Sequence, residues 1–236
     1  MNVAPVPYGR LGRAALSSRW FDRLMQRRAA NIVRMSALDE HLPENGLLLD
    51  LGSGLGHLAE VVLRRGQRRC IALDRVWSPP LPLAKRLRER LPGRLYALRA
   101  EATQLPFADA CFDAIWCAFV LHHLRPTAQE RVLAEVARVL APGAVFVLLE
   151  DTPVNAATLR SDRRLNFERH DAPHHYRSPD GWRAVLRDHG LLPQSDRSFT
   201  GIFPRVTVRA VWHLAFVCRR AQRPRQDLPA DGPPSR

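Results

Sequence analysis

Residues 47–60 read Leu-Leu-Leu-Asp-Leu-Gly-Ser-Gly-Leu-Gly-His-Leu-Ala-Glu, the most informative part of the sequence. An apolar run ends in Asp50 and passes into three glycines at alternate positions, after which an amphipathic helix begins. The pattern predicts a strand, a tight turn and a helix N-terminus, which together let a backbone approach a nucleotide-like ligand closely. Because Asp50 lies just before the turn, we expect a cationic ligand there rather than a pyrophosphate.

The glycines of this turn are Gly52, Gly54 and Gly56, and their G-x-G-x-G spacing differs from the G-x-G-x-x-G of dinucleotide-binding proteins. A glycine-rich turn is by itself a weak indication of a ligand, because any strand-to-helix turn can use glycine for positive φ. The residues that follow the turn therefore carry more weight.

Two further acids follow apolar runs. Residues 70–73 end in Asp74, about 20 residues past the glycine turn, and Glu101 lies just past the run 95–99. Because the carboxyl ends of parallel strands meet at one edge of an open α/β sheet, where ligands bind, we expect Asp50, Asp74 and Glu101 to lie together. An acid at the position of Asp74 suits ribose hydroxyls, and its alternative role is a helix cap or turn.

The order of motifs along the chain resembles that of class I S-adenosylmethionine-dependent methyltransferases. It is most similar to the small-molecule branch that includes the ubiquinone and menaquinone methyltransferases. The resemblance covers roughly residues 45–150 and rests on six motifs: Asp-Leu-Gly-Ser-Gly-Leu-Gly from 50, Ala-Leu-Asp ending at 74, Ala-Glu-Ala-Thr-Gln-Leu-Pro-Phe from 100, Phe-Asp-Ala-Ile from 112, Leu-His-His-Leu from 121, and Arg-Val-Leu-Ala-Pro-Gly from 138.

This resemblance implies S-adenosylmethionine as the cofactor. Asp50 and the glycine turn would face its methionine end, and Asp74 would hold its ribose. Glu101 would lie against the adenine, in the place where the family usually has Asp. The full set of cofactor-binding residues implied is Asp50, Gly52, Ser53, Gly54, Gly56, Asp74, Arg75, Glu101, Ala102 and Cys117.

Apolar runs that alternate with helical patterns predict an α/β fold with a parallel sheet. The resemblance implies a Rossmann-like, seven-stranded, mostly parallel sheet with helices on both faces. We expect strands at 47–51, 69–73, 95–99, 113–118, 144–150, 198–204 and 206–218, and helices near 14–41, 56–65, 81–91, 127–140 and 179–189. The expected parts are an N-terminal cap helix region (1–44), a methyltransferase domain (45–218) with an acceptor-covering insert (151–178), and a disordered tail (219–236).

Two groups of residues are candidates for catalysis. His122 and His123 follow the fourth expected strand, where either a general base or a structural, cofactor-side role fits the pair. The insert adds His174, His175 and Tyr176, as acceptor-binding or catalytic groups or as an ordinary surface loop. Residues 170–176 also offer metal ligands, but Pro173 leaves no regular ligand spacing, so we expect no metal site.

The chain has a formal net charge of +13. A basic surface suits an acidic carrier protein, an anionic membrane surface or RNA, or it has no specific partner. Residues 117–124 lack the Asn/Asp-Pro-Pro-Tyr/Phe motif of enzymes that methylate exocyclic amines of bases, so we do not expect nucleic acid as a partner. The four cysteines form no C-x-x-C pair, no apolar run reaches 18 residues, and no signal peptide is visible, which together predict a cytoplasmic protein.

The sequence therefore predicts an enzyme that transfers a methyl group from S-adenosylmethionine to a small hydrophobic or aromatic acceptor, free or carrier-bound, by O- or C-methylation. Two alternatives remain. An RNA methyltransferase would use the basic face, and a non-catalytic partner subunit would bind the cofactor without turnover. The acids Asp50, Asp74 and Glu101 favour retained cofactor binding in each case.

Overall fold

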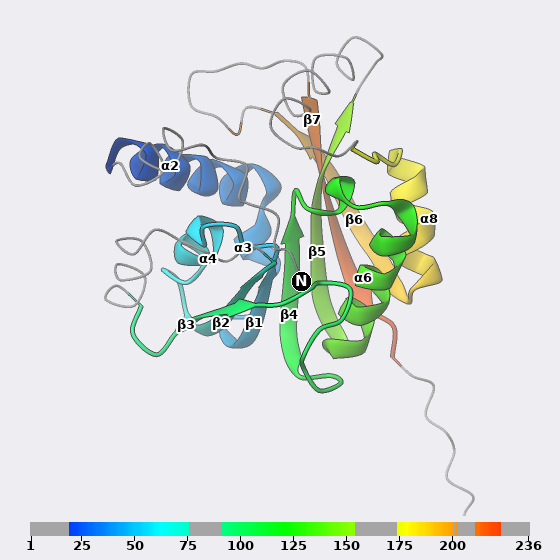
Figure 1. Ribbon diagram of the computed structural model, residues 1–236, viewed down its shortest axis with the longest axis horizontal. Coiled ribbons are helices and arrows are strands. Elements are labelled where there is room, and N and C mark those ends of the chain that lie inside the picture. The colour runs from blue at the N-terminus through cyan, green and yellow to red at the C-terminus, as the bar shows by residue number, and fades with distance from the viewer. Residues whose placement is uncertain (1–18, 76–90, 154–173, 201, 203–210, 223–236) are drawn as a thin grey trace, which may run out of the picture.

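Seven strands form one sheet in the order β3-β2-β1-β4-β5-β7-β6 (Figure 1). The computed structural model describes residues 19–75, 91–153, 174–200, 202 and 211–222. The neighbours from β3 to β5 are all parallel, whereas β7 is antiparallel to both β5 and β6. The expected mostly parallel sheet is confirmed. The strands are β1 (Asn45–Leu51), β2 (Gln67–Asp74), β3 (Leu95–Arg99), β4 (Phe112–Ala118), β5 (Leu140–Pro153), β6 (Leu191–Phe199) and β7 (Val211–Arg220).

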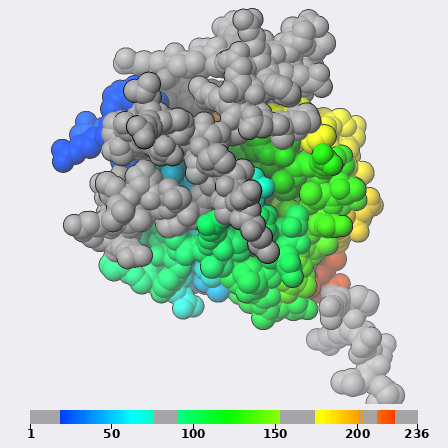
Figure 2. Space-filling view, in the orientation of Figure 1, coloured from blue at the N-terminus to red at the C-terminus, as the bar shows by residue number. Residues whose placement is uncertain are grey.

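Helices cover both faces of this sheet, as Figure 1 shows. One face carries α2 (Arg19–Ser36), α3 (Leu38–His41) and α4 (His57–Val62), and the other carries α6 (Pro126–Val139) and α8 (Pro179–Asp188). A single 3₁₀ turn, η1 (Leu121–His123), joins β4 to α6. Figure 2 shows the green segment that includes α6 and the yellow segment that includes α8 side by side on one surface.

The two apolar layers follow from the alternation of side chains along each strand. Leu48 of β1 is fully buried on the side of α2 and α4, whereas Leu49 and Leu51 are fully buried on the side of α6 and α8. Trp116 of β4 and Trp182 of α8 are among the largest fully buried side chains, one in each layer. Because both faces are covered, the central strands read as nearly continuous apolar runs.

The N-terminal helical region differs from the expected single helix over 14–41. Within the described residues, α2 ends at Ser36 and α3 begins at Leu38, because Ala37 adopts φ 56°. The Ser36 hydroxyl donates to the Ile32 carbonyl at 2.7 Å and accepts the Leu38 N–H at 3.3 Å, which compensates for part of the broken helix. The expected helix at 81–91 lies almost wholly outside the described residues.

The last two strands are shifted from their expected positions. The sixth strand was expected at 198–204 and is found at Leu191–Phe199, so that prediction is wrong. Pro193 and mostly exposed polar side chains hide its pattern, yet both are tolerated because β6 lies at the edge of the sheet. The seventh strand, Val211–Arg220, runs two residues past the expected domain end at 218.

The other expected boundaries fall partly on described residues. In the insert at 151–178, the structure describes the end of β5 and residues 174–178, and residues 223–236 of the expected tail lie outside the described part. Among the described helices, none is long and apolar enough to cross a membrane.

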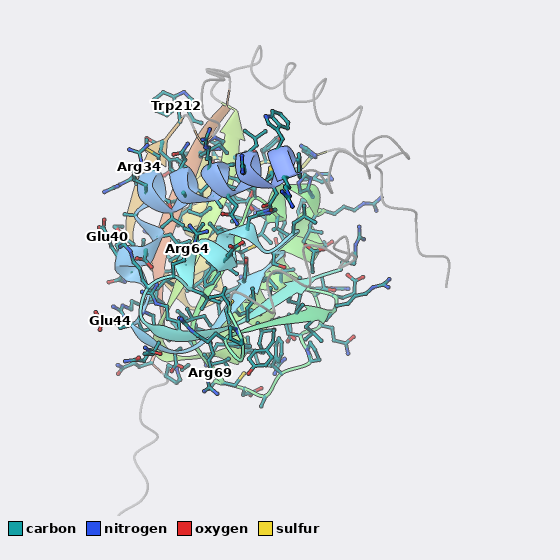
Figure 3. The ribbon with its side chains drawn as sticks, turned by 90° about the vertical axis from the view of Figure 1, so that its left-hand side faces the viewer. Arg34, Glu40, Glu44, Arg64, Arg69 and Trp212 are labelled. Carbon is teal, nitrogen blue, oxygen red and sulfur yellow. The ribbon has the colours of Figure 1, made fainter. Side chains whose placement is uncertain are left out.

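A surface pocket lies between α2 and the antiparallel edge of the sheet. Arg34, Phe199 and Trp212 contribute to its lining, and Figure 3 shows Arg34 and Trp212 on the same side of the molecule. It includes none of the site residues that the sequence predicts, so the candidate site is built from the residues at the strand ends instead.

Candidate cofactor and acceptor site

The glycine turn after β1 is held against the end of β2. The N–H groups of Gly52 and Ser53 both donate to the Leu73 carbonyl, at 2.8 and 2.9 Å, and the Gly56 N–H donates to the Ser53 carbonyl at 2.9 Å. All three glycines have positive φ, between 54° and 77°. These contacts fix the main chain of the turn at the carboxyl edge of the parallel strands.

Gly52 and Gly54 have different surroundings. A Cβ at Gly52 would lie 2.2 Å from Cγ2 of Val120, so this glycine allows the residues after β4 to pack directly on the turn. A Cβ at Gly54 would meet no heavy atom within 4 Å. The Gly54 N–H donates to Oδ2 of Asp74 at 2.8 Å. Gly54 therefore presents backbone to open space beside a carboxylate.

We expect alanine at these two positions to separate folding from ligand binding. Gly52→Ala combines a strained φ with a clash and should lower the free energy of unfolding by roughly 2–4 kcal/mol. Gly54→Ala carries only the strain of positive φ, roughly 1 kcal/mol, but places a methyl group where a ligand would approach. Urea denaturation should rank Gly52→Ala as the less stable variant, and calorimetry should show weakened S-adenosylmethionine binding by the folded Gly54→Ala variant. Equal stability of the two variants would contradict the role given to Val120.

Asp50 is a buried acid at the base of the turn, with 1% of its surface exposed. Burial raises the pKa of Asp50 to about 8, the nearby negative charge of Asp74 adds to this rise, and the Trp116 and Ala59 N–H groups oppose it. Among the described residues, the Ser53 hydroxyl is buried without a hydrogen-bond partner. Buried polar atoms are normally paired, so this hydroxyl at the base of the turn indicates room for a polar ligand group.

The remaining cofactor residues predicted from the sequence lie around this turn. Ala100 donates its N–H to the Asp74 carbonyl at 3.3 Å, which brings the chain before Glu101 next to the end of β2. Arg75 and Glu101 are exposed and Ala102 is half-buried. Cys117 differs from them, because its thiol is fully buried in the core and burial raises its pKa well above the ordinary value.

Glu150 holds the turn after β4. Its carboxylate accepts the N–H groups of Val120, Leu121 and His122, at 3.2, 2.7 and 3.3 Å, and pairs with His122 Nδ1 at 2.6 Å. Both Glu150 and His122 are buried. From the sequence, Glu150 and Asp151 at the end of an expected strand were candidates for the acceptor side, whereas the structure shows that Glu150 orients the His122 ring.

The segment 174–177 is joined to the same turn through its main chain. His175 donates its N–H to the His122 carbonyl at 2.7 Å, and the buried Gln129 side chain of α6 donates to the His175 carbonyl at 2.8 Å. Arg177 Nε donates to the side-chain Oε1 of Gln129 at 2.7 Å. Sequence reasoning missed Gln129, because a glutamine in an amphipathic helix gives no signal of a buried role.

These contacts bring four of the five candidate catalytic side chains together. His123 Nδ1 lies 3.0 Å from His174 Nε2, and His174 Nδ1 lies 2.8 Å from the Tyr176 hydroxyl. The rings of His122 and Tyr176 stack with their centroids 5.4 Å apart. His175 joins the group through its main chain. We call His122, His123, His174 and Tyr176 the histidine cluster.

A second group of polar and aromatic residues lies beside the end of β5. His213 Nδ1 pairs with Asp151 at 2.6 Å, and the Arg28 guanidinium of α2 lies 5.4 Å from the ring centroid of Phe119. Phe119 has φ 60°, a conformation uncommon for a bulky residue. Asp151 was a candidate from the sequence, but its pairing with His213 was not predicted, because the group joins the N-terminal helix to the last strand of the sheet.

The comparisons with known proteins agree with this geometry. Residues 49–148 match the family model described as a methyltransferase domain. Demethylmenaquinone methyltransferase of Thermus thermophilus is 34% identical over 122 residues, which cover 52% of this chain and 54% of that protein. The 27-O-demethylrifamycin SV methyltransferase of Amycolatopsis mediterranei is 30% identical over 158 residues, covering 63% and 54%. The chain thus spans about half the length of these curated relatives.

A solved structure extends the similarity over most of the chain. The 1,6-didemethyltoxoflavin-N1-methyltransferase of Burkholderia thailandensis, with bound 1,6-didemethyltoxoflavin and S-adenosylhomocysteine, superposes with a TM-score of 0.64 at 23% identity. The match covers 94% of this chain and 92% of that one, and at this identity it shows the fold.

The strand order, the glycine turn and the acid at its base define a class I methyltransferase fold. Residues 49–148 match a methyltransferase domain, and S-adenosylmethionine as the cofactor belongs to the proposal below. Within the described part of the chain, open space lies above Gly54 and the buried Ser53 hydroxyl at the base of the turn has no hydrogen-bond partner, so the turn has room for the polar groups of such a cofactor.

Proposed function

We propose that this protein transfers the methyl group of S-adenosylmethionine to a small hydrophobic or aromatic acceptor, at oxygen or carbon. The contact of Val120 with Gly52 carries the proposal, because it brings the turn that holds the histidine cluster directly against the cofactor turn. The relatives support a small acceptor, since their names describe methylation of a quinone precursor and of a rifamycin.

The residues divide into a cofactor side and an acceptor side. When bound, S-adenosylmethionine supplies an electrophilic methyl group on its sulfonium. Asp50 would offer negative charge to the cofactor's amino group, Asp74 would accept from the ribose hydroxyls, and Glu101 would contact the adenine. The histidine cluster offers donors and acceptors that orient a hydroxyl or carbonyl of the acceptor. Catalysis then depends mainly on positioning the acceptor in line with the methyl group.

The location and form of the acceptor are part of the proposal. The four cysteines Cys70, Cys111, Cys117 and Cys218 are free, which supports a reducing compartment such as the cytoplasm. The net charge of +13 supports an acceptor on an acidic carrier protein, or at an anionic membrane surface, as well as a free one.

Asp74→Ala should abolish tight S-adenosylmethionine binding while the protein stays folded. The carboxylate is half-buried at the end of β2 and its loss removes the proposed acceptor of the ribose hydroxyls, which costs about 10- to 100-fold in affinity. Calorimetric titration checks the binding, and circular dichroism checks the fold. Asp113→Ala is the control, since Asp113 bonds the Leu47 N–H at the opposite end of β1. Unchanged affinity of Asp74→Ala would exclude the ribose assignment.

The activity itself is tested with methyl-labelled S-adenosylmethionine and an extract of the source cells, separated into organic-soluble, RNA and protein fractions. We expect label in the organic fraction, or in the protein fraction if the acceptor is carrier-bound, and much less label with Asp74→Ala at the same cofactor concentration. Label in RNA would replace this proposal with the RNA methyltransferase alternative. Intact cofactor binding without any label would favour the non-catalytic partner subunit.

A further inference from the structure

We propose that His122, His123 and His174 bind one divalent transition metal ion, such as Zn²⁺, and that this ion holds an oxygen atom of the acceptor. One ring nitrogen from each histidine lies within 4.8 Å of the other two. The metal site follows from this geometry alone, whereas its contact with the acceptor rests on the proposed function. From the sequence, metal ligands were considered only within residues 170–176 and no site was expected there, because the pairing of His174 with His123, 51 residues earlier, is not visible in the local spacing.

The distances suit one ion. Imidazole nitrogens bind Zn²⁺ at about 2.0–2.1 Å, so two nitrogens in a tetrahedral site lie roughly 3.3 Å apart. His123 Nδ1 and His174 Nε2 are already 3.0 Å apart. The three rings are in contact, with centroid separations of 4.1, 4.5 and 5.1 Å. All three ligand nitrogens lie within 4.8 Å of one another, so the proposal requires the rings to turn toward one common ion.

Two of the three rings are oriented as metal-binding histidines usually are. A histidine ligand normally gives its other ring nitrogen to a carboxylate or another oxygen, which fixes the ring. Nδ1 of His122 pairs with Glu150 at 2.6 Å, and Nδ1 of His174 pairs with the Tyr176 hydroxyl at 2.8 Å. In both residues Nε2 is then the ligand nitrogen. The buried Glu150 carboxylate also offsets part of the charge of the ion.

The third ligand is brought to the site by buried contacts. His174 precedes His175, whose N–H and carbonyl are bonded to His122 and to Gln129, at 2.7 and 2.8 Å. Gln129 is fully buried and also donates to the Leu121 carbonyl at 3.0 Å. The same glutamine side chain therefore fixes both the turn that carries His122 and the segment that carries His174.

His122, His123 and His174 together offer one ion three imidazole ligands. Three histidines with a fourth position open is the ligand set of a catalytic Zn²⁺ site. A metal-bound hydroxyl loses its proton to water near neutral pH. The bound oxygen would then form its bond to the methyl carbon as the carbon–sulfur bond breaks, with that electron pair returning to sulfur.

The test is a titration of tag-free, full-length protein, stripped with a chelator, with Zn²⁺ and with Co²⁺ as a visible probe. We expect one ion per chain and a Co²⁺ absorption spectrum typical of an ion bound by nitrogen ligands. Loss of one ligand in His174→Ala should weaken Zn²⁺ binding about 100-fold or more, by the scale of effects at metal sites. His175→Ala is the matched control, because its main-chain hydrogen bonds survive the substitution and its Zn²⁺ affinity should equal that of the parent protein.

The outcomes separate this inference from the proposed function. Absence of stoichiometric Zn²⁺ binding, or equal Zn²⁺ affinity in folded His174→Ala and the parent protein, would overturn the metal site. Should His174→Ala fail to fold, His123→Ala takes its place in the same comparison. Methyl transfer that is lost on chelation and restored by Zn²⁺ would support the acceptor contact, and transfer indifferent to Zn²⁺ would overturn that contact. Calorimetry of S-adenosylmethionine with the stripped protein tests the proposed function independently of the metal.

Discussion

Glu150→Ala is expected to lower the free energy of unfolding by about 3–5 kcal/mol. The substitution leaves three backbone N–H groups and the ring of His122 without the acceptor that they share in the folded protein. Each buried donor left unpaired costs about 1–3 kcal/mol. Since Glu150 is fully buried, water cannot replace the carboxylate without rearrangement of the turn after β4.

Urea denaturation followed by circular dichroism measures this loss. The matched control is Glu130→Ala on α6, which also removes one carboxylate but from an exposed ion pair with Arg177. Surface pairs contribute roughly 0–1 kcal/mol, so this control should remain close to the parent protein. Equal effects of the two substitutions would contradict the role of Glu150 beneath the turn. Glu150→Gln should fall between them, because the amide keeps only one oxygen acceptor.

The arrangement of the residues proposed to bind the cofactor could be predicted, because its signals are local. Three positions of the turn have positive φ, which explains why glycines stand there. The acids lie at the strand ends that parallel pairing brings to one edge. The register pairs Asp50 with Ala72 and Asp74 with Arg99, so the order of these strands places both acids where the sequence analysis expected them. Short-range geometry and one rule of sheet topology were sufficient.

The parts of the fold that were wrongly placed depend on tertiary context. β6 has Pro193 at a register shift and polar side chains on most of its length, which an edge strand tolerates and a pattern search rejects. The break at Ala37 has no glycine or proline to mark it, and packing of Leu38 in the core fixes it instead. Neither signal is contained in the local pattern.

The acceptor half could be predicted as residue types but not as an arrangement. His122 and His174 were both candidates, yet their contact depends on Gln129 and Glu150, which come from α6 and β5. Cys117 shows the opposite case, because the resemblance implied it as a cofactor residue near the end of β4 while its side chain is buried in the core. A linear motif locates the main chain at the site, and packing decides which side chains face the ligand.

Asp50→Asn is expected to stabilise the cofactor-free protein and to weaken its binding of S-adenosylmethionine. Burial raises the pKa of Asp50 to about 8, from an ordinary value of 3.8. Between these two pH values, Asp50 is therefore protonated in the folded state and ionised in the unfolded state. The stability of the parent protein falls as pH rises through this window and levels off above about pH 8.

Asparagine has nearly the same shape and no proton to lose, so this decline should be absent from the variant. The linkage gives a gain of at most about 4 kcal/mol at pH 7, and none below the ordinary pKa of the acid. Thermal or urea unfolding at several pH values measures the difference between the two proteins. If the difference in free energy of unfolding between the two proteins does not grow from about pH 5 to about pH 8, the raised pKa of Asp50 is contradicted.

Binding should move in the other direction, because a cationic ligand favours the ionised carboxylate. We expect the affinity of the parent protein for S-adenosylmethionine to rise with pH up to about 8, and each binding event below that pH to release a proton from Asp50. Asp50→Asn should bind about 10- to 100-fold more weakly, the cost of losing a charge-assisted hydrogen bond. Calorimetry in two buffers of different ionisation enthalpy counts the released protons. Equal proton release by the parent and the variant would show that Asp50 does not face the cation. A variant that is more stable but binds S-adenosylmethionine more weakly would show that this carboxylate serves the cofactor and destabilises the fold.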